Sequence, residues 1–198
     1  MRIGRVMLVM LVSIGIFSSL VERSAAQSPA GRGAATTTSG PAPARGGAPA
    51  PPAMQVHANL LQLMRGTLYP ASNVLFAAQD KNPADVPQAT DPSVAVNPLE
   101  STYGKWEAVE NSALAIVEVA NLLTLPGRKC ANGRDVPIKN PDWPKFVQGL
   151  RDAGMTAYQA AKSKNQDKMV DAADVITTAC ANCHNKYRET PTLADRCK

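Results

Sequence analysis

The sequence predicts an all-α fold, an antiparallel four-helix bundle formed by residues 54–198. Three observations carry this prediction. Apolar residues recur at spacings of three and four in four successive segments, and no segment shows the apolar–polar alternation of a strand. The turn between the last two segments is short and polar, which favours antiparallel neighbours. The length of 54–198 is that of one domain with one core.

The first 26 residues have the three parts of a secretory signal peptide. Arg2 and Arg5 give a basic start, residues 6–21 are mostly apolar, and small residues at 24–26 provide a cleavage site. An uncleaved membrane anchor is the alternative, although the apolar run is shorter than the ~20 residues of a spanning helix. We therefore expect export to the periplasm and no membrane span in the mature chain.

Residues 27–53 are predicted to form a disordered linker. The segment is rich in proline, glycine and alanine and has almost no large apolar side chain. Such a composition cannot offset the entropy cost of ordering the chain. The segment is either a plain spacer or a tether for the domain at 54–198.

The first predicted helix presents one apolar face, with these residues at helical spacing: His57, Leu60, Leu61, Met64 and Leu68. Pro70 has no amide hydrogen to bond the carbonyl of Gly66, so we expect the helix to kink or pause there. Residues 82–98 contain four prolines and are predicted to form a long crossing loop.

The second predicted helix runs from about Leu99 to Leu123. Tyr103 is expected on its inner face, together with apolar residues one and two turns later. The pair Pro126 and Gly127 ends the helix, because neither residue favours its continuation.

The third and fourth predicted helices complete the bundle. Asp142 is expected to cap the third helix, and Pro144 lies in its first turn, where proline is tolerated. A polar turn at 165–167 leads to the fourth helix. The residues that this last helix is expected to turn inward are Met169, Ala172, Ala173, Ile176, Ala179, Cys180, Cys183 and Tyr187.

The clearest chemical signal is the sequence CANCH, which contains Cys180, Cys183 and His184. On a helix, the second cysteine and the histidine lie one turn from the first cysteine, so two sulfurs and an imidazole share one side. A structural zinc site takes four ligands, and the other cysteines and histidine have no paired spacing. A thioredoxin-like dithiol belongs in a βαβ setting. The motif is an attachment signal for c-type haem, and we expect one covalently attached haem c.

The two remaining cysteines, Cys130 and Cys197, are expected to form one structural disulfide in an oxidising compartment. Two free thiols are the alternative. The predicted core is rich in alanine, which leaves room for a macrocycle, and we expect the chain without haem to be poorly folded.

With these residues the chain resembles a class II cytochrome c, of the cytochrome c-prime type. The resemblance covers about 54–190 and is most specific in CANCHNKYR at 180–188 and LMRG at 63–66. It implies a four-helix bundle in which Cys180 and Cys183 hold the haem and His184 is the proximal iron ligand. It also implies that Arg188 lies near the haem edge or a propionate; a solvated surface arginine is the alternative.

The ligand on the other side of the iron is left open by the sequence. Met64 matches the position of the distal methionine in the low-spin branch of the family, although Leu60 stands where the family usually has a basic residue. Methionine at a helical core position is also common as filler. His57, the only other histidine, is the alternative distal ligand. The third possibility is an open site.

We expect this protein to carry one electron between redox partner proteins by Fe(II)/Fe(III) cycling. The alternative is a five-coordinate haem module that binds or senses small gases such as NO or CO. The net charge of +5 without a basic cluster gives no case for nucleic acid. No hydrolytic constellation or phosphate-binding glycine loop occurs, so we do not expect an enzyme. The chain is expected to be a monomer or a homodimer.

Overall fold

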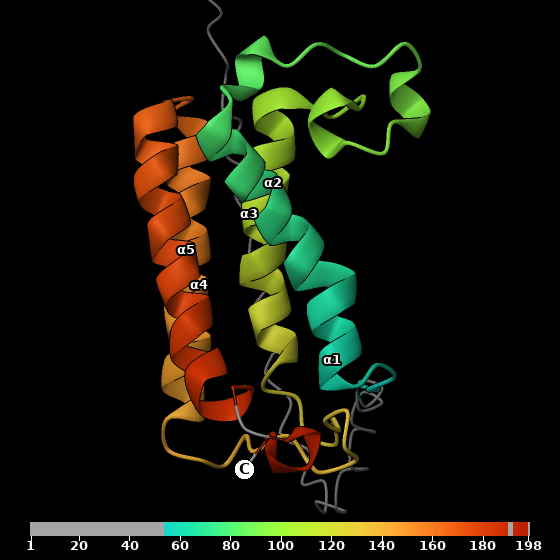
Figure 1. Ribbon diagram of the computed structural model, residues 1–198, viewed down its shortest axis with the longest axis vertical. Coiled ribbons are helices and arrows are strands. Elements are labelled where there is room, and N and C mark those ends of the chain that lie inside the picture. Colours follow the sequence, from blue (N-terminus) through green and yellow to red (C-terminus); the bar gives the residue numbers. More distant parts are fainter. Residues whose placement is uncertain (1–53, 190–191, 198) are drawn as a thin grey trace, which may run out of the picture. The chain divides into compact units, whose positions relative to one another are not determined.

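A computed structural model describes residues 54–189 and 192–197, so the predicted signal peptide and linker lie outside the described residues. Within this range the chain is helical, which confirms the all-α class. Its only extended pairing there is an isolated bridge between Lys129 and Asp135. Figure 1 shows the long helices side by side along one axis. None of the described helices has the length and apolar character required to cross a membrane.

The first helical segment is divided by a π-helical turn. It comprises α1 (Leu60–Leu63), the π-helical turn η1 (Met64–Leu68) and α2 (Tyr69–Asp80). At the end of η1 the amide of Tyr69 donates to the carbonyl of Met64, five residues earlier. The interruption expected at Pro70 is confirmed, because proline cannot supply the amide hydrogen of an α-helical bond.

The start of α1 is fixed by a capping box at Asn59 and Gln62. Each side chain accepts a hydrogen bond of 2.9 Å from the backbone amide of the other residue. The helix therefore begins at Leu60, and His57 precedes it in an exposed position. The prediction that His57 shares a helix face with Met64 is wrong.

The predicted long loop is confirmed between α2 and α3. It contains three short 3₁₀ turns, η2 (Pro83–Asp85), η3 (Pro92–Val94) and η4 (Pro98–Glu100). Each begins with a proline after an Asn or Asp whose side chain accepts an amide two residues on. These turns delay α3 (Lys105–Leu122), so the predicted start at Leu99 is wrong. Tyr103 lies outside the helix and is 67% exposed instead of facing inward.

The helices α4 (Trp143–Lys162) and α5 (Gln166–Tyr187) have the predicted positions. Asn165 caps α5 by accepting from the amide of Lys168. Asp142 occupies the N-cap position of α4, as predicted, but its side chain makes no capping hydrogen bond to that helix. Its carboxylate instead binds Tyr187 and Lys186, at the end of α5. A short 3₁₀ turn, η5 (Leu193–Asp195), follows in the C-terminal tail.

The core lies between the four long helices. α3 packs against α4, α4 packs against α5, and α2 contacts both α3 and α5. α3 and α4 approach closely at Gly154, where an added Cβ would lie 2.7 Å from Cγ2 of Val117. Small residues alternate with large, fully buried side chains, among them Leu75, Val109, Ile116, Trp143, Met169 and Ile176.

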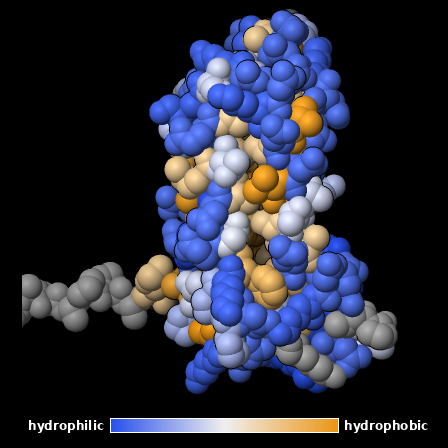
Figure 2. All heavy atoms as spheres, turned by 90° about the vertical axis from the view of Figure 1, so that its left-hand side faces the viewer, coloured by the Kyte–Doolittle hydropathy of each residue, from blue (hydrophilic) through white to orange (hydrophobic). Residues whose placement is uncertain are grey.

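The outer face formed by α4 and α5 carries apolar side chains along the long axis, between hydrophilic borders (Figure 2). Val170 and Val175 of α5 and Met155 of α4 are among the exposed large apolar residues. A shallow groove of about 340 Å³ lies between these two helices, lined in part by Gly149, Val175 and Ala179.

Candidate functional site

A cavity of about 1070 Å³ opens between the first helical segment and α5. Its volume slightly exceeds the ~300–1,000 Å³ that is typical of ligand sites. The lining is mostly apolar and combines residues that are far apart in the sequence. The first helical segment contributes Leu60, Met64, Leu68 and Phe76, and α5 contributes Cys180, Cys183 and His184.

The three residues of the CANCH motif lie on the last two turns of α5. Cys180 and Cys183 are half-buried free cysteines, and His184 is half-buried beside them. All three line the cavity, and both cysteines pack against the hydrophobic core. The helical spacing expected from the sequence thus brings two sulfurs and one imidazole to one cavity wall.

Burial determines the protonation of these side chains. It is the main cause that raises the pKa of Cys180, and it raises the pKa of Cys183 to about 11, with smaller contributions from Cys180 and Asp142. Burial, followed by the charge of Arg188, lowers the pKa of His184. The thiols and the imidazole are therefore neutral near pH 7, and a neutral imidazole is the form that binds metals.

Among the described residues, no three His, Cys, Asp or Glu side chains are grouped so that they would hold a metal ion. The motif therefore does not complete a metal site from protein side chains alone within the described ranges.

Met64 lies on the other wall of the cavity, at the first position of the π-helical turn η1. It is half-buried and packs against the core. π-Helical turns of this kind occur frequently at functional sites. His57, in contrast, is exposed and does not line the cavity. Of the two candidate distal ligands, the structure places only Met64 at the cavity.

The chain that leads into α1 is held by Arg128, which is only 4% exposed. Its guanidinium donates hydrogen bonds to the carbonyls of Ala58 and Leu122. The amide of Leu60 also donates to the carbonyl of Lys129, at 2.8 Å. These bonds join the beginning of α1 to the end of α3 and so position the wall that carries Met64.

Arg188, the residue expected near a haem propionate, lines the cavity but is already paired. Its side chain is 54% exposed and forms an ion pair with the neighbouring Glu189. That carboxylate offsets much of the positive charge that Arg188 would offer to a ligand.

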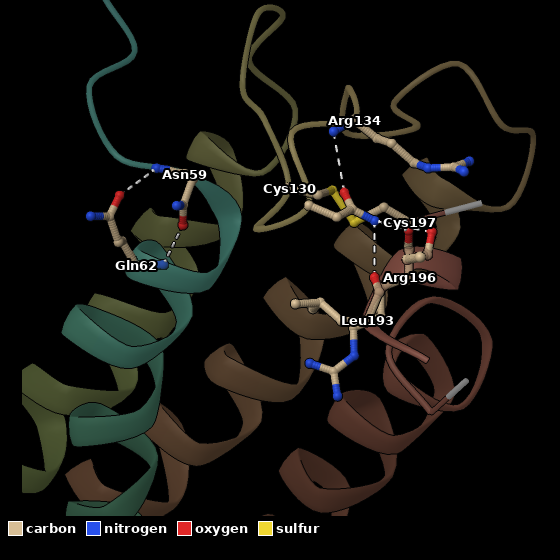
Figure 3. The surroundings of a disulfide bond; sticks show 9 residues. Asn59, Gln62, Cys130, Arg134, Leu193, Arg196 and Cys197 are labelled. Atoms are coloured by element: carbon tan, nitrogen blue, oxygen red, sulfur yellow. Dashed lines mark hydrogen bonds between the residues drawn. A yellow bond between two sulfur atoms is a disulfide. The ribbon is translucent and has the colours of Figure 1, made fainter. Parts of the chain in front are cut away.

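The C-terminal tail closes one end of the cavity. The predicted disulfide between Cys130 and Cys197 is confirmed, with Cα atoms 6.5 Å apart (Figure 3). The side-chain amide of Asn132 donates to the carbonyls of Leu193 and Arg196, at 3.1 and 3.0 Å. The amide of Cys197 donates to the carbonyl of Tyr187 at 3.0 Å, so the tail returns to the end of α5.

Arg196 is a cavity residue that sequence reasoning missed. It lines the cavity, and its Nε is buried without a hydrogen-bond partner in the described ranges. Its one signal in the sequence is its position beside Cys197, since a disulfide from that cysteine draws the tail toward the domain.

The chain matches no model of a known protein family, no curated protein and no solved structure.

Proposed function

We propose that this protein is an exported monohaem c-type cytochrome that carries one electron between redox partner proteins. In this proposal the four long helices form an antiparallel bundle of the class II type. One observation carries it: Cys180, Cys183 and His184 line the same large cavity as Met64, although more than a hundred residues separate the motif from the methionine.

The cavity residues fit a covalently attached haem c. The volume suits a bulky ligand, and the mostly apolar lining suits the macrocycle, whose burial from water is favourable. The two cysteines are free and border the cavity, as thioether formation with the haem vinyl groups requires. Burial keeps the imidazole of His184 neutral, which is the ligating form.

Each residue then has a defined task. Cys180 and Cys183 would hold the haem covalently, and His184 would bind the iron on the proximal side. Met64 is the preferred distal ligand, because it lines the cavity whereas His57 is exposed outside it. When bound, the haem supplies a one-electron Fe(II)/Fe(III) couple, and a methionine ligand raises its potential relative to two histidines.

A gas-binding haem module is the second candidate function. Leu60, Leu68 and Phe76 line the cavity together with Met64. If Met64 does not bind the iron, these apolar side chains would shield an open coordination position. Such a position would take a small diatomic ligand such as NO or CO.

Absorption spectra of the holoprotein, with and without carbon monoxide, separate the two candidates. Electron transfer predicts a low-spin ferric spectrum with a methionine–iron charge-transfer band, which is lost in Met64→Ala. Met155→Ala removes a methionine 39% exposed on α4 and is the matched control, with an unchanged spectrum. A high-spin ferric form that binds carbon monoxide readily would favour the gas-binding module.

The haem assignment has its own test in Cys180→Ala/Cys183→Ala. Intact-mass measurement of this variant after export should show no covalent haem, while the wild-type chain carries one. Covalent haem on the double variant would refute the attachment site. The same measurement on the exported wild-type chain also checks the cleavage after residue 26 that the signal peptide predicts.

A further inference from the structure

The C-terminal tail is held over the end of the cavity by several independent ties. The disulfide between Cys130 and Cys197 fixes it covalently, and the side-chain amide of Asn132 donates hydrogen bonds to the carbonyls of Leu193 and Arg196 in the tail. The amide of Cys197 is in turn bonded to the carbonyl of Tyr187. A segment held in this way positions its side chains precisely enough to contribute to a binding site.

Arg196 lies between two of these ties, because its carbonyl accepts from Asn132 and the next residue is Cys197. Figure 3 shows its guanidinium turned away from the disulfide, toward the helices. The buried Nε has no hydrogen-bond partner among the described residues. A buried donor without a partner is costly, which indicates that a ligand in the cavity supplies the acceptor.

The other charged residues at the cavity do not offer an equivalent donor. Arg188 is paired with Glu189, and both are exposed. Arg65 lines the cavity from η1 and is exposed. His184 is assigned to the iron in the proposed function, so it is not the donor for an anionic group of the ligand. Among the cations that line the cavity, Arg196 therefore has a buried donor atom and no carboxylate partner in the described chain.

We propose that Arg196 binds an anionic carboxylate of the cavity ligand, namely a propionate of the haem. This inference rests on the proposed function. A guanidinium matches a carboxylate with two parallel donors, and such charge-assisted bonds are stronger than neutral ones. The disulfide then has a second role beyond stability, since it holds the anion-binding residue at the cofactor.

The test compares Arg196→Gln with Arg134→Gln in the holoprotein. Arg134 is an exposed arginine of the same loop as Cys130, and it does not line the cavity. The measurements are the reduction potential as a function of pH and the propionate bending band in the resonance Raman spectrum. Thermal unfolding of both variants, followed by circular dichroism, records any general loss of stability.

We expect Arg196→Gln to lower the reduction potential at neutral pH, because a nearby positive charge favours ferrous over ferric iron. The propionate should titrate about 1–3 pH units higher, since an adjacent arginine lowers the pKa of a carboxylate by that amount. The Raman band should shift. Arg134→Gln should have the reduction potential, the propionate titration and the Raman band of the wild type.

Arg196→Lys provides a second variant that keeps the charge and loses the paired donors. This variant should retain most of the wild-type reduction potential, while its propionate Raman band shifts. If Arg196→Gln does not fold, Arg196→Lys replaces it in the test. A wild-type potential, titration and Raman band in folded Arg196→Gln would overturn the inference. If intact mass shows that the wild-type chain carries no haem on Cys180 and Cys183, the proposed function itself has failed.

Discussion

The hydroxyl of Tyr187 donates a hydrogen bond of 2.6 Å to the carboxylate of Asp142. This bond joins the last residue of α5 to the residue before α4. The ring of Tyr187 also lies edge-on to Trp143, with ring centroids 5.0 Å apart. The last turn of α5, which carries His184, is thereby attached to the beginning of α4.

Removal of the Tyr187 hydroxyl tests whether its hydrogen bond to Asp142 stabilises the domain. Tyr187→Phe keeps the ring contact but deletes the donor, and we expect the midpoint of thermal unfolding to fall by roughly 2–4 °C. Tyr103→Phe removes a hydroxyl that is exposed in the long loop and should leave the midpoint unchanged. Equal midpoints for the two variants would show that the bond between Tyr187 and Asp142 contributes nothing to stability.

Acid should weaken the hydrogen bonds that the carboxylate of Asp142 accepts from the end of α5. The hydrogen bond from Lys186, followed by that from Tyr187, lowers the pKa of Asp142 below its ordinary value of 3.8. A carboxylate whose pKa is lower in the folded state contributes stability above the ordinary value, and the contribution is lost as the pH falls through the folded value. The stability difference between wild type and Asp142→Asn should therefore be constant above about pH 5 and should shrink below pH 3.8. Denaturant unfolding at several pH values measures it, and a difference that grows toward low pH would contradict the assignment.

The close approach of α3 and α4 predicts opposite effects of alanine at two glycines of α4. In Gly154→Ala the new Cβ would lie 2.7 Å from Cγ2 of Val117 and 3.3 Å from the carbonyl oxygen of Ala113. We expect a loss of about 1–3 kcal/mol in the free energy of unfolding. Gly149 has open space around its Cα, so Gly149→Ala should gain about 0.5–1 kcal/mol from helix propensity. Chemical denaturation of both variants provides the comparison.

The disulfide should stabilise the domain, because it constrains the unfolded chain across the loop that it closes. Cys130 and Cys197 are separated by 67 positions. Cys130→Ala/Cys197→Ala should lower the free energy of unfolding by about 2–5 kcal/mol. A thiol reductant should bring the wild type to the stability of this variant and leave the variant itself unchanged. A further reductant-dependent loss in the variant would show that another group is responsible.

The sequence predicted the helices well where periodicity is strong and local, as in α4 and α5. It failed where short polar side chains compete for backbone amides. Asn59 starts α1 after His57, and the turns at Asn97 and Pro98 delay α3 beyond Tyr103. Asp142 was expected to cap α4, but a nonlocal partner, Tyr187, takes its carboxylate.

In the candidate site, too, the features set by neighbouring residues could be predicted, whereas those set by distant residues could not. The spacing of Cys180, Cys183 and His184 was readable because all three lie on one helix. The approach of Arg196 to the cavity depends on a disulfide that closes a long loop, and its position beside Cys197 is its one signal in the sequence. The spacing of apolar residues along the chain does not predict contacts that a disulfide makes between distant segments.

The π-helical turn Met64–Leu68 amounts to one residue more than an α-helix would use in the same turn. Deleting a single residue there would restore the α-helical register and rotate everything before it by about 100°. The wall that now carries Leu60 and Met64 would then turn away from α5. The extra residue of the π-helical turn thus determines which side chains face the cavity across from His184. Deletion of one codon would change this set of side chains more than most substitutions would.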